Sequence, residues 1–135
     1  MPSALPDGLL RDQTGAQTLV GWVTDTTHPD GARLILEVGP QHTNRHGVLH
    51  GGIIAMLLDS ACGYTGSMWT DRVSLPPMLS LTFTTQFLAP AREGTVTASG
   101  RVTGGGKRTL FIDGRLHDAE DRLIATSTGV YKPVS

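Results

Sequence analysis

The feature that most constrains this chain is an apolar helical stretch that contains a single charge. From Ile53 to Cys62, eight of ten residues are apolar, and the pattern leaves no polar face. Such a helix is expected to be buried on all sides. Asp59 is the one charge in this run, and a carboxylate that loses water is unfavourable unless it is hydrogen-bonded or kept for chemistry. Asp59 is therefore the first candidate functional residue.

The start of the same helix offers a second candidate feature. Gly51 and Gly52 follow His50 directly, so the first turn carries no side-chain bulk. The first amides of a helix lack internal partners and lie at the positive end of the macrodipole, where they can polarise a carbonyl or hold an oxyanion. Alternatively, the glycines only form a tight turn and Asp59 is a satisfied core residue. The combination of the two features favours a site.

Taken together, these residues resemble the motif of hotdog-fold acyl-CoA thioesterases of the phenylacetate-degradation (PaaI-like) type. The motif residues are Asn44, Gly47, His50, Gly51, Gly52 and Asp59. The resemblance runs from about Leu19 to Tyr131, and in the strands it places only Ser80, the segment 87–90 and the turn 106–108. It implies a long antiparallel β-sheet wrapped around one central α-helix, with a dimer as the working unit.

The residue pattern by itself predicts the α+β class. The β-rich runs 18–24 and 33–38 flank turn residues and are interpreted as a hairpin. The helix is expected to span roughly five turns and to end before Asp71, since Pro76 and Pro77 follow. Four β runs then follow without a helical period, at 78–88, 94–104, 107–117 and 123–132. Strands before one helix and a meander after it indicate a layered α+β domain.

The first strand after the helix has two distinct faces by alternation. Its apolar face is predicted to be core and holds Leu79, Leu81, Phe83 and Phe87. Its polar face holds Ser80, Thr82, Thr84 and Gln86. Ser80 differs from the others only through the resemblance, which gives this position a hydroxyl that helps to hold the attacking water.

Length and charge exclude several classes of protein. With 135 residues, the chain is expected to form one domain over 18–135 after an N-terminal lead-in over 1–17. The net charge of −1 provides no basic stripe for nucleic acid. No apolar run suits a signal peptide or a membrane span, so a cytoplasmic protein is expected. The lone Cys62 is interpreted as a core residue.

Other chemistries fit the sequence less well. His42, His46 and His50 are four residues apart, but Asn44 and Gly47 interrupt them before the helical pattern begins, so no metal site is predicted. There is no Gly-x-Ser-x-Gly elbow for a serine nucleophile. The turn 104–108 lacks the spacing of a P-loop, and its Lys107 and Arg108 either are solvated or, in the hotdog interpretation, clamp coenzyme A phosphates.

Helix geometry indicates that two chains share one site. Gly51 and Asp59 are eight residues apart, which is about 12 Å along a helix and too far for both to act on one thioester carbon. If two antiparallel helices meet across a two-fold axis, Gly51 of one chain faces Asp59 of the other. The resemblance implies the same homodimer, and a dimer of dimers is expected from it.

The resemblance implies hydrolysis of an aryl- or medium-chain acyl-CoA without a separate cofactor, since coenzyme A is part of the substrate. In this interpretation Asp59 would be the base or the nucleophile, and Ser80 would assist it. The Gly51 N–H would polarise the thioester carbonyl, and Asn44 would orient that carbonyl. His50 would position the loop or touch the thioester. The residues expected to contact coenzyme A or the acyl group are Lys107, Arg108, Gly52, Met56 and Phe87. Leu57 and Met68 are further candidates for the wall of the acyl site.

The alternative functions are a hotdog enoyl-CoA hydratase or dehydratase, whose usual motif is absent, and a non-catalytic acyl-CoA-binding protein.

Overall fold

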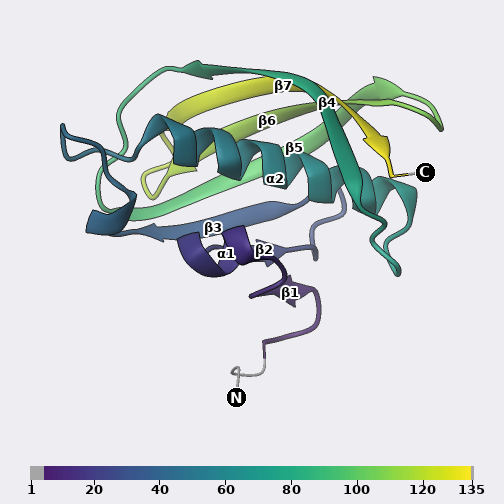
Figure 1. The fold of residues 1–135 in the computed structure, drawn as a ribbon, viewed down its shortest axis with the longest axis horizontal. Helices are drawn as coiled ribbons and strands as arrows, with labels where there is room; N and C mark the ends of the chain where they lie inside the picture. Colours follow the sequence, from purple (N-terminus) through teal and green to yellow (C-terminus); the bar gives the residue numbers. More distant parts are fainter. Residues whose placement is uncertain (1–4, 135) are drawn as a thin grey trace.

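The structure is a computed structural model that describes residues 5–134, and it consists of one long sheet and one long helix (Figure 1). In chain order the elements are β1 (Leu9–Leu10), α1 (Gly15–Val20), β2 (Val23–Asp25), β3 (Arg33–Val38), a 3-10 helix (Pro40–His42), α2 (Gly51–Thr70), β4 (Met78–Phe87), β5 (Gly94–Gly105), β6 (Leu110–Asp118) and β7 (Leu123–Pro133). The predicted α+β class is confirmed, as are the helix and the four strands after it.

The seven strands form a single antiparallel sheet in the order β1-β2-β3-β5-β6-β7-β4. The sheet curves around α2, so that β3 lies on one side of the helix and β4 and β7 lie on the other (Figure 1). β4 follows α2 directly but lies at the far edge of the sheet, where β7 is its one neighbour in the described chain. This arrangement brings β4 and β7 beside the middle of α2, where Asp59 lies.

The ends of α2 are set by local hydrogen bonds. The helix begins at Gly51 because Nδ1 of His50 accepts a hydrogen bond from Gly52 N–H at 2.8 Å and caps the first turn. It ends at Thr70, and the Asp71 carboxylate then accepts from Val73 N–H at 2.9 Å and turns the chain. The predicted end before Asp71 is confirmed. No helix within residues 5–134 is long and apolar enough to cross a membrane.

One side of α2 is buried and the other is open. The buried side comprises Ile54, Leu57, Leu58, Ala61, Cys62, Thr65 and Met68. On the open side Met56 is 36% exposed, and Asp59, Ser60 and Tyr64 are only half-buried. The expectation of burial on all sides is therefore wrong for a single chain, because one sheet covers one side of a helix. Composition could not reveal the open side, since it too carries apolar residues.

Two facing glycines set how closely α2 lies on the sheet. Gly100 of β5 and Gly114 of β6 are paired across the sheet beneath the helix. A Cβ at Gly100 would lie 2.9 Å from the Ala61 carbonyl, and one at Gly114 would lie 3.1 Å from Sγ of Cys62. Side chains at these positions would push α2 outward. The depth of the helix, and therefore the height of Asp59 above the strands, depends on both glycines.

The segment predicted as a first strand over 18–24 divides between the end of a helix and the start of a shorter strand. Its β-branched composition suggested a strand, but α1 runs through Val20, and β2 begins only at Val23. The local signals explain the difference: Oγ1 of Thr14 caps the helix by accepting from Gln17 N–H, and Gly21 ends it in the left-handed conformation at φ +98°. The predicted hairpin with β3 remains, formed by the shorter β2.

A β-bulge in β4 overturns the predicted faces of this strand. Ser80 pairs with Tyr131 of β7 and Thr82 pairs with the adjacent Val130, so Leu81 has no partner in the ladder. Before the bulge, the even-numbered Ser80 of β4 faces α2. After the bulge, the odd-numbered residues of β4 face this side, because they pair with Ser127 and Ala125 of β7. Leu79 and Leu81 are consequently not core residues, being 48% and 52% exposed.

His42 joins the loop before α2 to the end of α1. Its imidazole is 3% exposed, its Nδ1 accepts from Gly39 N–H at 2.9 Å, and its Nε2 donates to the Val20 carbonyl at 2.7 Å. Because both ring nitrogens are bonded to backbone groups, His42 holds the N-terminal segment against the loop that leads into the helix.

Replacing this histidine should therefore destabilise the protein. His42→Ala leaves the half-buried Gly39 amide and the buried Val20 carbonyl without partners, and a loss of about 2–4 kcal/mol in the free energy of unfolding is expected. Urea unfolding followed by circular dichroism measures it. His46→Ala, on an exposed side chain of the same loop, should stay within about 0.5 kcal/mol of the parent. Equal effects of the two substitutions would contradict the role given to His42.

Candidate active site

The site is built around the carboxylate of Asp59, which three elements hold in place. Asp59 projects from the middle of α2, and its Oδ1 accepts a hydrogen bond from Oγ of Ser80 on β4 at 2.6 Å. The same oxygen accepts a second bond from the hydroxyl of Tyr131 on β7 at 3.2 Å. These two hydroxyl donors replace hydrogen bonds to water that a half-buried carboxylate loses. The structure thus places Ser80 in direct contact with Asp59, the residue that the family resemblance expected it to assist.

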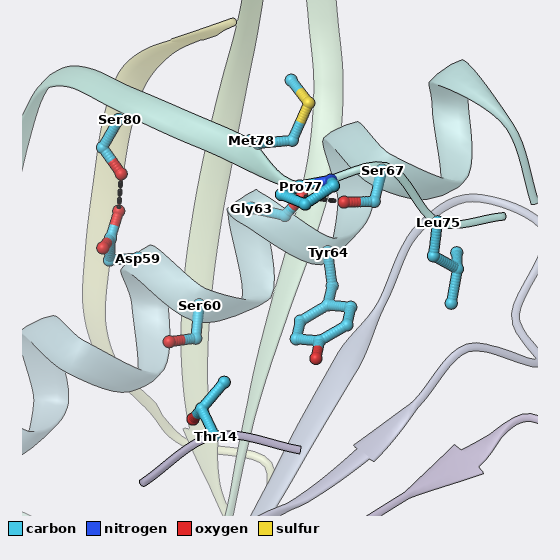
Figure 2. A pocket seen from close by; sticks show the side chains of 10 residues that line it. All are labelled: Thr14, Asp59, Ser60, Gly63, Tyr64, Ser67, Leu75, Pro77, Met78 and Ser80. Atoms are coloured by element: carbon cyan, nitrogen blue, oxygen red, sulfur yellow. Dashed lines mark hydrogen bonds between the residues drawn. The ribbon is translucent and has the colours of Figure 1, made fainter. Parts of the chain in front are cut away.

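A pocket of about 360 Å³ opens beside this carboxylate (Figure 2). Asp59 and Ser80 lie at one side of it, and the hydroxyl of Tyr64 and the side chain of Ser60 border it from α2. The other lining residues are Thr14, Gly63, Ser67, Leu75, Pro77 and Met78. The pocket therefore combines the Asp59 carboxylate with an apolar end formed where α2 turns into β4, and the N-terminal segment contributes to its wall through Thr14.

The start of α2 forms a second hollow of about 380 Å³. Gly51 lies there with Asn44, and Phe87 of β4 approaches closely enough that a Cβ at Gly51 would meet its ring at 3.4 Å. Within residues 5–134 the Gly51 N–H has no hydrogen-bond acceptor. An unpaired amide at a helix start, in a hollow, is suited to bind a carbonyl oxygen.

Asn44 and His50 shape the loop around this amide. Oδ1 of Asn44 accepts from His46 N–H at 2.9 Å, and the Asn44 backbone bonds to Val48, so the side chain fixes the turn through the left-handed Gly47. The exposed imidazole of His50 caps α2 through Nδ1, which leaves its N–H on Nε2. Both residues thus have a defined structural task beside any contact with a ligand.

Gly51 and Asp59 do not serve one cavity within the chain. Gly51 and Asn44 line one hollow, whereas Asp59 and Ser80 line the other. The eight residues between Gly51 and Asp59 correspond to about 12 Å of helix. A single chain therefore holds half of the predicted site residues in each of two separate hollows.

The predicted basic turn lies at the end of the β5–β6 hairpin. Lys107 and Arg108 are exposed and border a hollow of about 520 Å³ together with Lys132 and Leu81. Lys132 follows Tyr131 and Leu81 follows Ser80, so strand alternation places this cationic hollow on the face of the sheet that points away from α2. Lys132 was not predicted, because nothing in its local sequence connects it to the turn.

The other predicted contact residues are dispersed. Gly52 is exposed, and a Cβ there would meet the His50 ring at 3.0 Å. Met56 lies on the open side of α2, and Phe87, 57% exposed, lies beside Gly51. Leu57 is fully buried in the core, and Met68 borders a separate small hollow beside Trp69. Of these residues, Phe87 and Met56 are the apolar surfaces a ligand could reach.

The described part of the chain contains no group of three or more His, Cys, Asp or Glu side chains suited to a metal ion. His42, one of the three histidines considered above, is occupied by backbone groups. Burial raises the pKa of the Cys62 thiol to about 12, so this cysteine stays protonated beside the site and is not a nucleophile.

Sequence reasoning missed Tyr131 as a neighbour of Asp59. The two residues are 72 positions apart, and the contact depends on the strand order that places β7 beside β4. The Ser80–Tyr131 pairing also depends on the bulge at Leu81. Strand alternation alone gives no signal for either feature.

Comparison with known proteins agrees with this architecture. Residues 46–125, more than half of the chain, match the sequence model of the thioesterase superfamily. A Pseudomonas aeruginosa protein named "Putative esterase" is 34% identical over 97 residues, covering 71% of this chain and 70% of that protein. The E. coli PaaI protein from the phenylacetic acid degradation operon has a similar structure, with a TM-score of 0.81, 22% identity and coverage of 91% and 86%. A Bacillus halodurans structure with CoA gives a TM-score of 0.83, 20% identity and coverage of 93% and 82%.

A long antiparallel sheet wrapped around one central helix defines a hotdog domain, and the structural matches share this fold. The chain belongs to the thioesterase superfamily. The family recognised from the spacing of Asn44, His50 and Asp59 is thereby confirmed.

Proposed function

We propose that this protein hydrolyses an aryl- or medium-chain acyl-CoA to the free acid and coenzyme A, at a site shared by two chains. The observation that carries the proposal is the 2.6 Å hydrogen bond between Ser80 and Asp59 beside an open pocket, in a thioesterase-superfamily fold. The Bacillus halodurans structure with CoA supports the choice of thiol.

Asp59 supplies the basic oxygen of the reaction. As a base, its carboxylate takes a proton from water while the water oxygen bonds to the thioester carbon; as a nucleophile, it attacks that carbon itself, and water later cleaves the anhydride. In both routes the carbon–sulfur bond breaks, and the sulfur leaves as the coenzyme A thiolate and gains a proton. Ser80 holds the carboxylate and the water.

The start of α2 binds the thioester oxygen. The unpaired Gly51 N–H donates to it, and the charge that develops on the oxygen is stabilised by the positive end of the helix. Asn44 orients the carbonyl from the adjacent turn, while His50 fixes the first turn and directs its Nε2–H outward. Gly52 keeps the approach open because it carries no side chain.

Two features support pairing of two chains. The open side of α2 leaves Met56 exposed and Asp59 half-buried, and β4 is an edge strand. If the open sides face each other across a two-fold axis, Gly51 of one chain approaches Asp59 of the other, and two equal sites form. Met56 and Phe87 then line the path of the acyl group. Further pairing of these dimers is part of the same proposal.

The basic turn holds the nucleotide end of the substrate. Lys107 and Arg108 contact coenzyme A phosphates, and Lys132, at the rim of the same hollow, adds a third positive charge.

The carboxylate is tested first. Asp59→Asn keeps the shape of the side chain but removes the base, so thiol release from benzoyl-, phenylacetyl- and long-chain acyl-CoA should fall by roughly a hundredfold or more with the fold retained. Asp121→Asn, in an exposed turn of the sheet, should leave turnover unchanged. Near-normal turnover in Asp59→Asn would remove this residue from the mechanism, and a parent protein that releases no thiol would favour a non-catalytic binder.

The basic turn is tested by comparing two substrates. Lys107→Ala with Arg108→Ala should raise KM for acyl-CoA by about tenfold, since charge-assisted phosphate contacts are lost, and should spare a short thioester that lacks the nucleotide. The double substitution Arg101→Ala with Arg115→Ala removes two exposed charges from the middle of the sheet and serves as the control. Equal effects on both substrates would show that the turn binds no phosphate.

The shared site is tested by mixing inactive variants. Gly51→Pro removes the donor amide and Asp59→Asn removes the base, so each homodimer should be nearly inactive, while circular dichroism checks that both fold. In a heterodimer one interface keeps an intact Gly51 and an intact Asp59, and the other carries both lesions. Purified heterodimers should recover about half of the parent activity, as two-fold symmetry requires. Heterodimers as inactive as the homodimers would place the site within one chain.

A further inference from the structure

We infer that Tyr131 is a positioning residue for Asp59: with Ser80 it occupies Oδ1 and leaves Oδ2 as the oxygen that acts on the substrate. The inference rests on the proposed function, which it deepens by assigning the reacting atom. It applies equally if Asp59 is the base or the nucleophile.

The two donors converge on one oxygen because their strands are paired. Ser80 and Tyr131 lie opposite each other in the β4–β7 ladder, and both face α2. Their hydroxyls reach Oδ1 at 2.6 Å and 3.2 Å. A carboxylate oxygen has two lone-pair positions for donors, and two hydroxyls fill them. Within residues 5–134, Oδ2 accepts no hydrogen bond, so its lone pairs stay available for water or a thioester carbon.

The two donors differ in how firmly they are held. Ser80 is exposed, whereas Tyr131 is 1% exposed and packs in a core cluster with Cys62, Leu110 and Ile112. A packed aromatic ring has few alternative rotamers, so its hydroxyl is a fixed point for the carboxylate. Ser80 on an edge strand can also move to assist the water.

The surroundings keep Tyr131 a donor. Burial raises the pKa of the Tyr131 hydroxyl, and the neighbouring negative charge of Asp59 raises it further, so the phenol remains protonated across the working pH range. The adjacent Cys62 thiol is also protonated, because burial raises its pKa to about 12, and it brings no competing charge. Asp59 is thus fixed by a neutral donor whose protonation does not change.

Kinetics test the positioning role. Tyr131→Phe keeps the ring in the core and removes only the hydroxyl; kcat should fall by about tenfold while KM for acyl-CoA stays within about twofold of the parent. Ser80→Ala with Tyr131→Phe should lose more than the product of the two single losses, since either hydroxyl alone still restrains Oδ1. Thr128→Val, an exposed hydroxyl on the outer face of β7, should match the parent.

Unchanged kcat in Tyr131→Phe would overturn the inference, as would a loss confined to KM. A double variant whose loss equals the product of the single losses would show that the hydroxyls act independently and would overturn their sharing of one oxygen. Melting temperatures of the variants separate these results from unfolding.

Nuclear magnetic resonance tests the contact without any substrate. The chain has two tyrosines, so protein labelled at tyrosine 13Cζ gives two signals, and Tyr64→Phe identifies that of Tyr131. In Asp59→Asn the Tyr131 signal should shift because its acceptor changes, while the Tyr64 signal stays in place. An unmoved Tyr131 signal would overturn the inference. A protein that shows this shift but hydrolyses no thioester would defeat the proposed function alone, whereas thioester hydrolysis with no shift would defeat the positioning role alone.

Discussion

The site depends on the hydrogen-bonding needs of one carboxylate in an apolar helix. Asp59 loses part of its water in α2, and the sheet replaces it with two hydroxyl donors from β4 and β7. Both donors reach it because Gly100 and Gly114 allow the helix to lie close to the strands. The glycines of β5 and β6 therefore belong to the support of the site, although neither contacts the carboxylate.

The bulge at Leu81 serves both the fold and the site. It changes which side chains of β4 face the helix, so that the strand presents Ser80 at the middle of α2 and Phe87 near its start. Without the bulge, these two residues could not point to the same side, because seven positions separate them and strand faces alternate with a period of two. One unpaired residue thus lets a single edge strand contribute to both hollows.

The division of the motif between two hollows is a consequence of helix length. An amide at the start of α2 and a carboxylate eight residues later cannot meet on one substrate atom, because the helix separates them by about 12 Å. The open side of the helix carries apolar and half-buried residues that a single sheet leaves uncovered. A second copy of the chain would cover this surface and complete the constellation in one step.

The sequence by itself determined the α+β class, the bounds of α2, the later strands, the family, and Asp59 with Ser80 as candidate partners. These follow from local signals: apolar periodicity, prolines, turn glycines and a motif of fixed spacing. The sequence-based prediction was wrong over residues 18–22, where the helix caps at Thr14 and Gly21 outweigh β-branched composition. It was also wrong at Leu79 and Leu81, where a bulge shifts the alternation. Only the tertiary structure decided three features: Tyr131 contacts Asp59, Lys132 lies beside the basic turn, and one side of α2 is open. Each of these depends on strand order and register between segments that are far apart in the chain.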